Sequence, residues 1–198
     1  TDFIVKQVTK RMSDQKELIN QVLKGNPKAQ KQLYDSHAAT MLGVCFRYCK
    51  SLAEAEDMLQ EGFVKVFNNL KQFKGTGELG AWIRRIMVNT AINEIKKSKL
   101  TLISQEDEND AENLSSTEDP EILLTAKEIA SIIQLMPDGY RIVFNLHAIE
   151  GFSHNEIASL LNIKPVSVRS QYQRARMLLI ELLQKAEVKR QKPVENGK

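Results

Sequence analysis

Residues 153–176 read SHNEIASLLNIKPVSVRSQYQRAR, and two helix starts can be recognised in this stretch. The first is SHNE, a capping box at 153–156, which predicts a helix that runs to about Leu160. The second is Pro165, a residue favoured in the first turn of a helix. Between them Asn162 tolerates the left-handed backbone that a tight turn requires. The stretch therefore predicts a short helix, a tight turn and a long helix.

The long helix has one apolar side and one polar side. Helical spacing defines an inward stripe made of Val168, Tyr172, Ala175, Leu179 and Leu182. Mostly outward lie side chains of the types that bind base edges and phosphates: Ser167, Arg169, Ser170, Gln171, Gln173, Arg174 and Arg176. A solvated helix face would have a similar composition. Because the capped turn, the short first helix and the one-sided Arg, Gln and Ser cluster occur together, we predict a helix-turn-helix that binds duplex DNA.

The remainder of the chain is also expected to be helical, so the predicted fold class is all-α. The 198 residues include only 9 Gly and 5 Pro, and no long run alternates apolar with polar residues. The expected helices span about 13–23, 27–50 as one helix or a pair, 51–70, 81–97 and 122–135, with a further helix ending near 151. The helix of 51–70 starts with a second capping-box pattern, Ser51 to Glu54. A glycine-rich loop is expected over 73–80.

Helix 81–97 is predicted to carry a polar stripe opposite its buried side. The inward residues are Ile83, Ile86, Met87, Ala91 and Ile95. Arg85, Asn89, Asn93 and Lys96 recur at spacings of four, four and three, and therefore share the outer face. Arg84 and Lys97 lie beside them, and the preceding loop adds Lys74 and Thr76. Opened DNA needs such a basic surface, with pockets or stacking groups, and this helix and loop offer one.

Charge is distributed unevenly along the chain. Residues 1–98 carry 16 Lys and Arg against 10 Asp and Glu, residues 99–121 carry 1 against 8, and residues 122–198 carry 11 against 7. Two basic blocks thus flank an acidic strip without periodicity, which is typical of a flexible linker. The expected organisation is two small helical domains, 13–98 and 122–185, joined by an acidic linker at 99–121 and followed by a disordered tail at 186–198.

Several classes of site are not expected. Cys45 and Cys49 cannot form a disulfide framework. A metal site would need further ligands, but His37 is the one histidine near them in the sequence and His147 and His154 lie far along the chain, so we interpret both cysteines as buried and inert rather than as a thiol or metal site. Clustered carboxylates or a nucleophile beside basic residues, which an enzyme acting on DNA would need, are not found. No catalytic residue and no cofactor is therefore predicted. A chain without an apolar span or a signal peptide is expected in the cytoplasm.

Both halves of the chain resemble one protein family, the bacterial alternative sigma factors of the extracytoplasmic-function group. The stretch SHNEIASLL at 153–161, with SVRS at 167–170 and RAR at 174–176, resembles their region-four helix-turn-helix. EAEDMLQE at 54–61 resembles their polymerase-binding motif, and AWIRRI at 81–86 followed by NTAIN at 89–93 resembles their promoter-melting helix. The resemblance extends from about Ser13 to Leu183.

The resemblance implies a monomeric, non-enzymatic subunit that gives core RNA polymerase its promoter specificity. The residues implied in binding the coiled coil of the largest polymerase subunit are Glu54, Asp57, Gln60 and Glu61. Those implied in capturing the opened -10 element are Lys74, Thr76, Arg84, Arg85, Asn89, Asn93, Lys96 and Lys97. The seven outward residues of the last helix would read the -35 element as duplex. The polymerase flap and an anti-sigma factor are further implied partners. A stand-alone helix-turn-helix regulator is the alternative.

Overall fold

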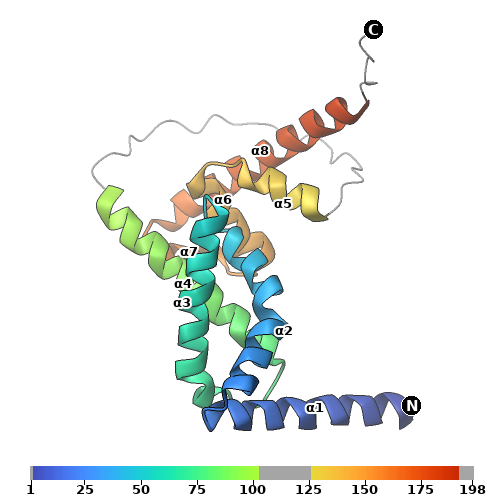
Figure 1. Ribbon diagram of the computed structural model, residues 1–198. Coiled ribbons are helices and arrows are strands. Elements are labelled where there is room, and N and C mark those ends of the chain that lie inside the picture. Colours follow the sequence, from blue (N-terminus) through green and yellow to red (C-terminus); the bar gives the residue numbers. More distant parts are fainter. Residues whose placement is uncertain (1, 103–125, 192–198) are drawn as a thin grey trace. The chain divides into compact units, whose positions relative to one another are not determined.

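The computed structural model describes residues 2–102 and 126–191, and the regular elements in these ranges are all helical (Figure 1). The all-α fold is thereby confirmed for this part of the chain. The elements are α1 (Asp2–Leu23), α2 (Pro27–Phe46), α3 (Leu52–Asn69), η1 (Leu70–Gln72), α4 (Leu79–Leu102), α5 (Ala126–Gln134), α6 (Asp138–Phe144), η2 (Asn145–Ile149), α7 (His154–Leu161) and α8 (Pro165–Gln191). None of the described helices is long and apolar enough to cross a membrane.

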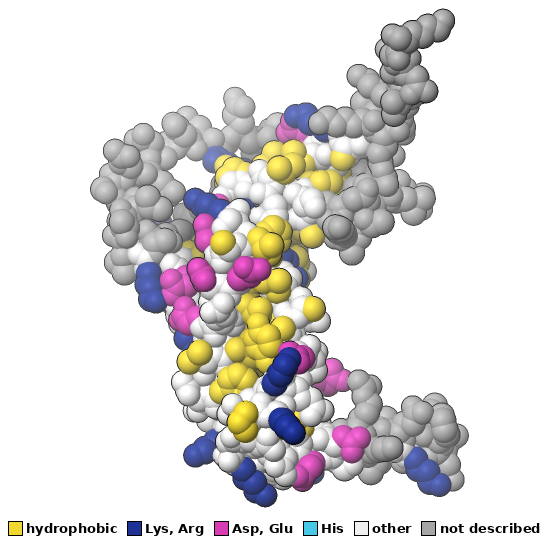
Figure 2. Space-filling view, in the orientation of Figure 1, with side chains coloured by type: hydrophobic (Ala, Val, Ile, Leu, Met, Phe, Trp, Pro, Cys, Tyr) yellow, Lys and Arg dark blue, Asp and Glu magenta, His cyan; other side chains and the backbone are white. Residues whose placement is uncertain are grey.

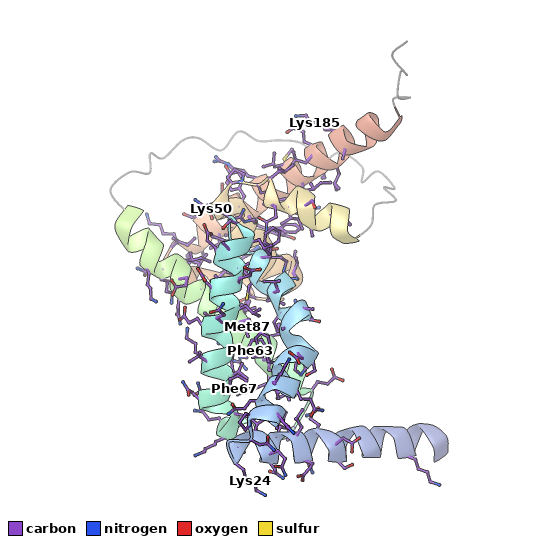
Figure 3. All side chains as sticks on the ribbon, viewed as in Figure 1. Lys24, Lys50, Phe63, Phe67, Met87 and Lys185 are labelled. Atoms are coloured by element: carbon purple, nitrogen blue, oxygen red, sulfur yellow. The ribbon has the colours of Figure 1, made fainter. Side chains whose placement is uncertain are left out.

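Contacts divide the chain into two compact units, Thr1–Ile95 and Lys96–Lys198. In the first unit α2 and α3 pack against each other, and their aromatic side chains meet. The ring centroids of Tyr34 and Phe63 lie 4.6 Å apart, and those of Phe63 and Phe67 lie 6.1 Å apart. Figure 3 shows Phe63 and Phe67, with Met87 of α4, in a row between α2 and α3. The largest fully buried side chains of this core are Leu33, Leu70, Ile83, Met87 and Ile92.

Helix α4 approaches α3 closely at Gly62. A Cβ atom built on Gly62 would lie only 2.2 Å from the Sδ atom of Met87, whose side chain is fully buried. One turn further along α3, the Lys65 ammonium donates a hydrogen bond to Thr90 Oγ1 of α4 at 3.3 Å. The missing side chain of Gly62 thus leaves the space on α3 that the Met87 thioether occupies.

The core of the second unit forms along α8. Ile133, Met136 and Ala175 are buried together, and Tyr140, Phe144, Leu178, Leu179 and Leu182 pack against them. Arg141 is almost completely buried and joins α5 to α6. Its guanidinium donates to Asp138 Oδ1 at 2.9 Å and to Gln134 Oε1 at 3.2 Å, so a charged group holds the turn between the two helices. The predicted inward stripe of α8 is confirmed at Val168 and Ala175, which are fully buried.

Several helix ends differ from the sequence expectation. Helix α1 begins at Asp2 rather than after Ser13, because residues 2–23 contain neither Gly nor Pro and a serine inside a helix is only mildly unfavourable. Helix α8 continues to Gln191, into the range 186–198 that was expected to be disordered. The sequence from 186 to 191 consists mostly of good helix formers, and the next proline is Pro193.

Two further boundaries move. Helix α2 ends at Phe46, so Cys49 lies in the turn that follows rather than on the same helix as Cys45. Helix α4 spans Leu79–Leu102, which shortens the loop to 73–78 and carries the helix into the first residues of the expected linker. The rest of the linker, to 121, lies outside the described residues, as does the expected start of α5 near 122.

Candidate nucleic-acid interface

The first helix of the predicted helix-turn-helix, α7, begins with a complete capping box. Ser153 Oγ accepts a hydrogen bond from the Glu156 backbone N–H at 3.3 Å, and Glu156 Oε2 accepts from the Ser153 backbone N–H at 2.8 Å. The Ser153 hydroxyl also donates to the same carboxylate oxygen at 2.7 Å. These bonds favour the ionised carboxylate and lower the pKa of Glu156. The predicted capping box is confirmed.

The turn that leads into α8 is also as predicted. Asn162 has φ 55° and ψ 48°, a left-handed conformation, and the backbone N–H of Ile163 donates to the Ala158 carbonyl at 3.0 Å. Helix α8 starts at Pro165, and the Lys164 carbonyl accepts hydrogen bonds from the backbone N–H groups of Ser167 and Val168. This turn sets the direction in which α8 leaves α7.

A cluster of aromatic and histidine rings holds α8 against the preceding elements. His147, in the π-helical turn η2, stacks on His154 at 4.3 Å between ring centroids and meets Tyr172 of α8 edge-on at 4.5 Å. His147 Nδ1 is hydrogen-bonded to the Phe152 carbonyl at 2.7 Å. Burial, followed by the positive charges of His147 and Arg169, lowers the pKa of His154. The His154 ring thus packs where its charged form is disfavoured. Sequence reasoning missed this cluster, because its members come from three segments and show no common periodicity.

The seven predicted -35 residues divide into two groups along α8. Arg169, Gln173 and Arg176 are exposed, and Ser167 and Ser170 are half-buried near them in sequence. Gln171 and Arg174 instead lie over α6. The Arg174 guanidinium donates to Tyr140 Oη at 3.5 Å, and a Cβ atom on Gly139 would lie 3.7 Å from Gln171 Oε1.

Helical spacing explains this division. Gln171 and Arg174 lie four positions and one position before Ala175, which is fully buried, so they occupy the margin of the buried side. The seven residues therefore do not form one exposed face. Arg169, Gln173 and Arg176 recur at spacings of four and three and form the exposed part.

The polar stripe predicted on α4 is present. Arg85, Asn89, Asn93, Lys96 and Lys97 are all exposed, whereas Arg84 is half-buried. On the opposite side Ile83, Met87, Ala91 and Ile95 are buried, as expected, and Ile86 is half-buried. This helix thus shows cations and amides on one side and an apolar contact surface on the other.

The loop before α4 is fastened at one end. Phe73 packs on Trp82 of α4 with 5.6 Å between ring centroids, and both side chains are half-buried. Lys74 and Thr76 follow Phe73 and are exposed. The half-buried ring of Trp82 anchors the loop at the edge of the unit. The anchored loop keeps Lys74 and Thr76 near the first turns of α4.

The predicted polymerase-binding residues lie on α3. Glu54, Asp57 and Gln60 are exposed and Glu61 is half-buried. Figure 2 shows acidic side chains gathered over the first turns of this helix. Glu54 also caps the helix: its backbone N–H donates to Ser51 Oγ at 3.2 Å, and its carboxylate accepts from the Lys50 backbone N–H at 2.9 Å. The second capping box thus differs from the expected form, since the carboxylate reaches Lys50 rather than Ser51.

Glu61 pairs within its own helix. Its carboxylate lies 2.6 Å from the Lys65 ammonium, four residues further along α3. Of the predicted polymerase-binding acids, Glu54 therefore caps the helix and Glu61 pairs with Lys65, whereas the exposed carboxylate of Asp57 is assigned to neither interaction.

Neither cysteine lies in a reactive environment. Both are buried free thiols, as expected, and Cys49 Sγ lies 3.9 Å from Met58 Sδ. Burial raises the pKa of Cys45 to about 11, which leaves the thiol protonated at neutral pH. Within the described residues no three His, Cys, Asp or Glu side chains are grouped in a way that would hold a metal ion.

Comparison with known proteins identifies both halves of the chain. Residues 33–101 match the family described as Sigma-70 region 2, and residues 126–179 match Sigma-70, region 4. The chain is 30% identical over 180 residues to the ECF RNA polymerase sigma-E factor of Escherichia coli (strain K12), a match that covers 85% of this chain and 93% of that protein. It is 29% identical over 179 residues to the RNA polymerase sigma-H factor of Pseudomonas aeruginosa, with the same coverage.

Two solved structures are similar to the chain. One is CnrH in complex with the cytosolic domain of CnrY, with a TM-score of 0.44 and 24% identity over 85% of this chain and 96% of that one. The other is the sigma factor RpoE in complex with the anti-sigma factor NepR from Bartonella quintana, with a TM-score of 0.45 and 20% identity over 78% and 96%. From the extent and identity of the sequence matches, the chain belongs to the extracytoplasmic-function group of the sigma-70 family, the alternative sigma factors that direct transcription initiation.

Proposed function

We propose that this chain binds core RNA polymerase through α3 and brings it to promoters through two separate DNA-binding surfaces on α4 and α8. The observation that carries the proposal is the one-sided exposure of cations and amides on both DNA-binding helices, each backed by a buried apolar side. The subunit acts without catalytic residues of its own. Since it works on the polymerase, its place is the cytoplasm.

On α3 the contact is acidic. We assign the coiled coil of the largest polymerase subunit to the surface of Glu54, Asp57, Gln60 and Glu61. Asp57 is the strongest candidate because its carboxylate is exposed, whereas Glu54 caps the helix and Glu61 pairs with Lys65. A complementary basic surface on the polymerase would steer association and set specificity.

On α4 the contact is with opened DNA at the -10 element. Exposed Arg85, Lys96 and Lys97 supply charge for phosphates, and Asn89 and Asn93 supply amides for base edges. Half-buried Arg84 and the exposed loop residues Lys74 and Thr76 complete the proposed set.

On α8 the contact is with duplex DNA at the -35 element. Arg169, Gln173 and Arg176 face outward and are assigned to bases and phosphates, with Ser167 and Ser170 beside them. Arg174 and Gln171 reach DNA only from the side of α6, so their contacts are proposed at the margin of the interface. The polymerase flap and an anti-sigma factor are the further partners that family membership suggests.

Transcription with reconstituted holoenzyme on a pool of promoters tests the proposal. We expect run-off transcripts from a subset of promoters that core polymerase alone does not use. Asp57→Ala should weaken core binding in a pull-down while leaving duplex DNA binding by the second unit intact. Asp35→Ala removes an exposed carboxylate from α2 instead and should leave core binding unchanged.

The stand-alone regulator makes the opposite prediction. It requires tight, sequence-specific binding by the isolated chain, and it requires no association with polymerase. Failure of the wild-type chain to bind core polymerase would therefore reject the sigma-factor proposal and favour the regulator.

A further inference from the structure

The second residue of α8, Val166, is one of the most exposed apolar side chains in the described part of the protein. It is 68% exposed, at the start of a helix whose next valine, Val168, is fully buried. Single exposed apolar residues are ordinary on protein surfaces, so exposure alone assigns Val166 no role. The position of Val166 on the helix is what indicates a role.

Val166 stands at the leading end of the exposed side of α8. Arg169, Ser170 and Gln173 follow it at spacings of three, four and seven, which places all four on one side of the helix. In helix-turn-helix proteins the first residues of the second helix contact base edges in the major groove. The left-handed turn at Asn162, three residues before the start of α8, leads the chain into this helix. In that docking the end of α8 that carries Val166 is the one that enters the groove.

The charge of this segment limits what can lie against it. Between Glu156 and Glu181 the sequence has no acidic residue and four basic ones, of which Lys164 and Arg169 flank Val166 most closely. A polyanion is the fitting occupant, and an apolar side chain within such a surface needs an apolar feature on that polyanion. In the major groove that feature is the C5 methyl group of thymine, which the other bases lack.

We infer that Val166 selects thymine at one position of the -35 element by contact with its C5 methyl group. The inference rests on the proposed function, since it requires α8 to enter the major groove. Valine suits the task because its branched Cβ holds one rotamer in a helix, so the side chain is already ordered before binding. The hydroxyl and guanidinium groups beside it would read polar base edges, and Val166 would read the methyl group.

The test compares thymine with uracil, which differ by that methyl group alone. A promoter selected from a pool by wild-type holoenzyme is prepared with each -35 thymine replaced singly by deoxyuridine, and holoenzyme binding is measured by competition. We expect one position at which wild type prefers thymine about fourfold, the effect of burying a single methyl group. Val166→Ser and Val166→Thr form a matched pair, because both introduce a hydroxyl and only threonine keeps a methyl.

At that position we expect Val166→Thr to retain a preference for thymine and Val166→Ser to lose it. Leu135→Ala, which truncates an equally exposed apolar residue after α5, should give the wild-type pattern. The inference is overturned if Val166→Ser discriminates as wild type does, or if wild type discriminates at no thymine. A holoenzyme that initiates from no promoter of the pool would instead reject the proposed function, whichever residue occupies position 166.

Discussion

Replacing Gly62 with alanine should destabilise the first unit, although alanine is the better helix former. A Cβ atom at this position would lie 2.2 Å from Met87 Sδ and 2.9 Å from Met87 Cε, whereas ordinary contacts begin near 3.4 Å. Met87 is fully buried and has no solvent into which it can turn. Overpacking of this kind costs about 1 to 3 kcal/mol. Alanine in a helix interior returns about 1 kcal/mol. The net loss of stability is therefore between about zero and about 2 kcal/mol, with about 1 kcal/mol in the middle of the range.

Thermal and urea unfolding of the full chain measure this loss, with a fall in Tm of roughly 4 to 8 °C per kcal/mol for a unit of this size. Gly43→Ala is the matched control, because Gly43 is exposed in α2 and a Cβ there would meet no atom within 4 Å. It should gain about 1 kcal/mol. In the double variant with Met87→Ala, the loss should be smaller than the sum of the single losses. A Gly62→Ala protein that melts at or above wild type would refute the reasoning.

Three further predictions concern the second unit and the cysteines. Asn162→Ala should lose about 1 kcal/mol in denaturant unfolding and Asn162→Gly should not, because φ at this position is 55°. Glu156→Gln should lower Tm at neutral pH. Since the folded-state pKa of Glu156 lies below its ordinary value of 4.5, the gap from wild type should persist above that pH and close as the pH falls further. The Cys45 thiol, with its pKa raised to about 11, should react with a thiol reagent at pH 8 only after unfolding; rapid labelling of the folded protein would contradict its burial.

Local chemistry explains which parts of this fold were predictable from the sequence. The capping box at Ser153, the left-handed turn at Asn162 and the first-turn proline at 165 each depend on neighbours within a few residues, and all three are present. The outer face of α4 was predictable for a similar reason, since a spacing of 3.6 residues per turn fixes which side chains share a side.

Features that depend on tertiary contact were not predictable. Gln171 and Arg174 have the same residue types as their exposed neighbours, and only the position of α6 shows that they lie at the buried margin. The stacking of His147 on His154 requires the π-helical turn η2, for which no sequence signal was recognised. Helix ends also moved wherever good helix formers continued past a boundary that composition suggested, as at Gln191.

The number of exposed cations predicts how strongly each proposed DNA-binding surface would bind on its own. On the proposed -35 surface Lys164, Arg169 and Arg176 are exposed. If each contacts one phosphate, we expect a salt dependence of binding with a slope of about −2.7. A fourfold rise in salt concentration should then lower the affinity by only about 40-fold. The electrostatic contribution to binding is therefore expected to be smaller than in proteins with six to ten phosphate contacts. The α4 surface contributes a similar number through Arg85, Lys96 and Lys97. If both surfaces are held on one polymerase, binding through the second surface becomes intramolecular. Two weak DNA contacts then give a much higher overall affinity. Promoter binding should therefore require the polymerase even though each helix carries its own reading surface.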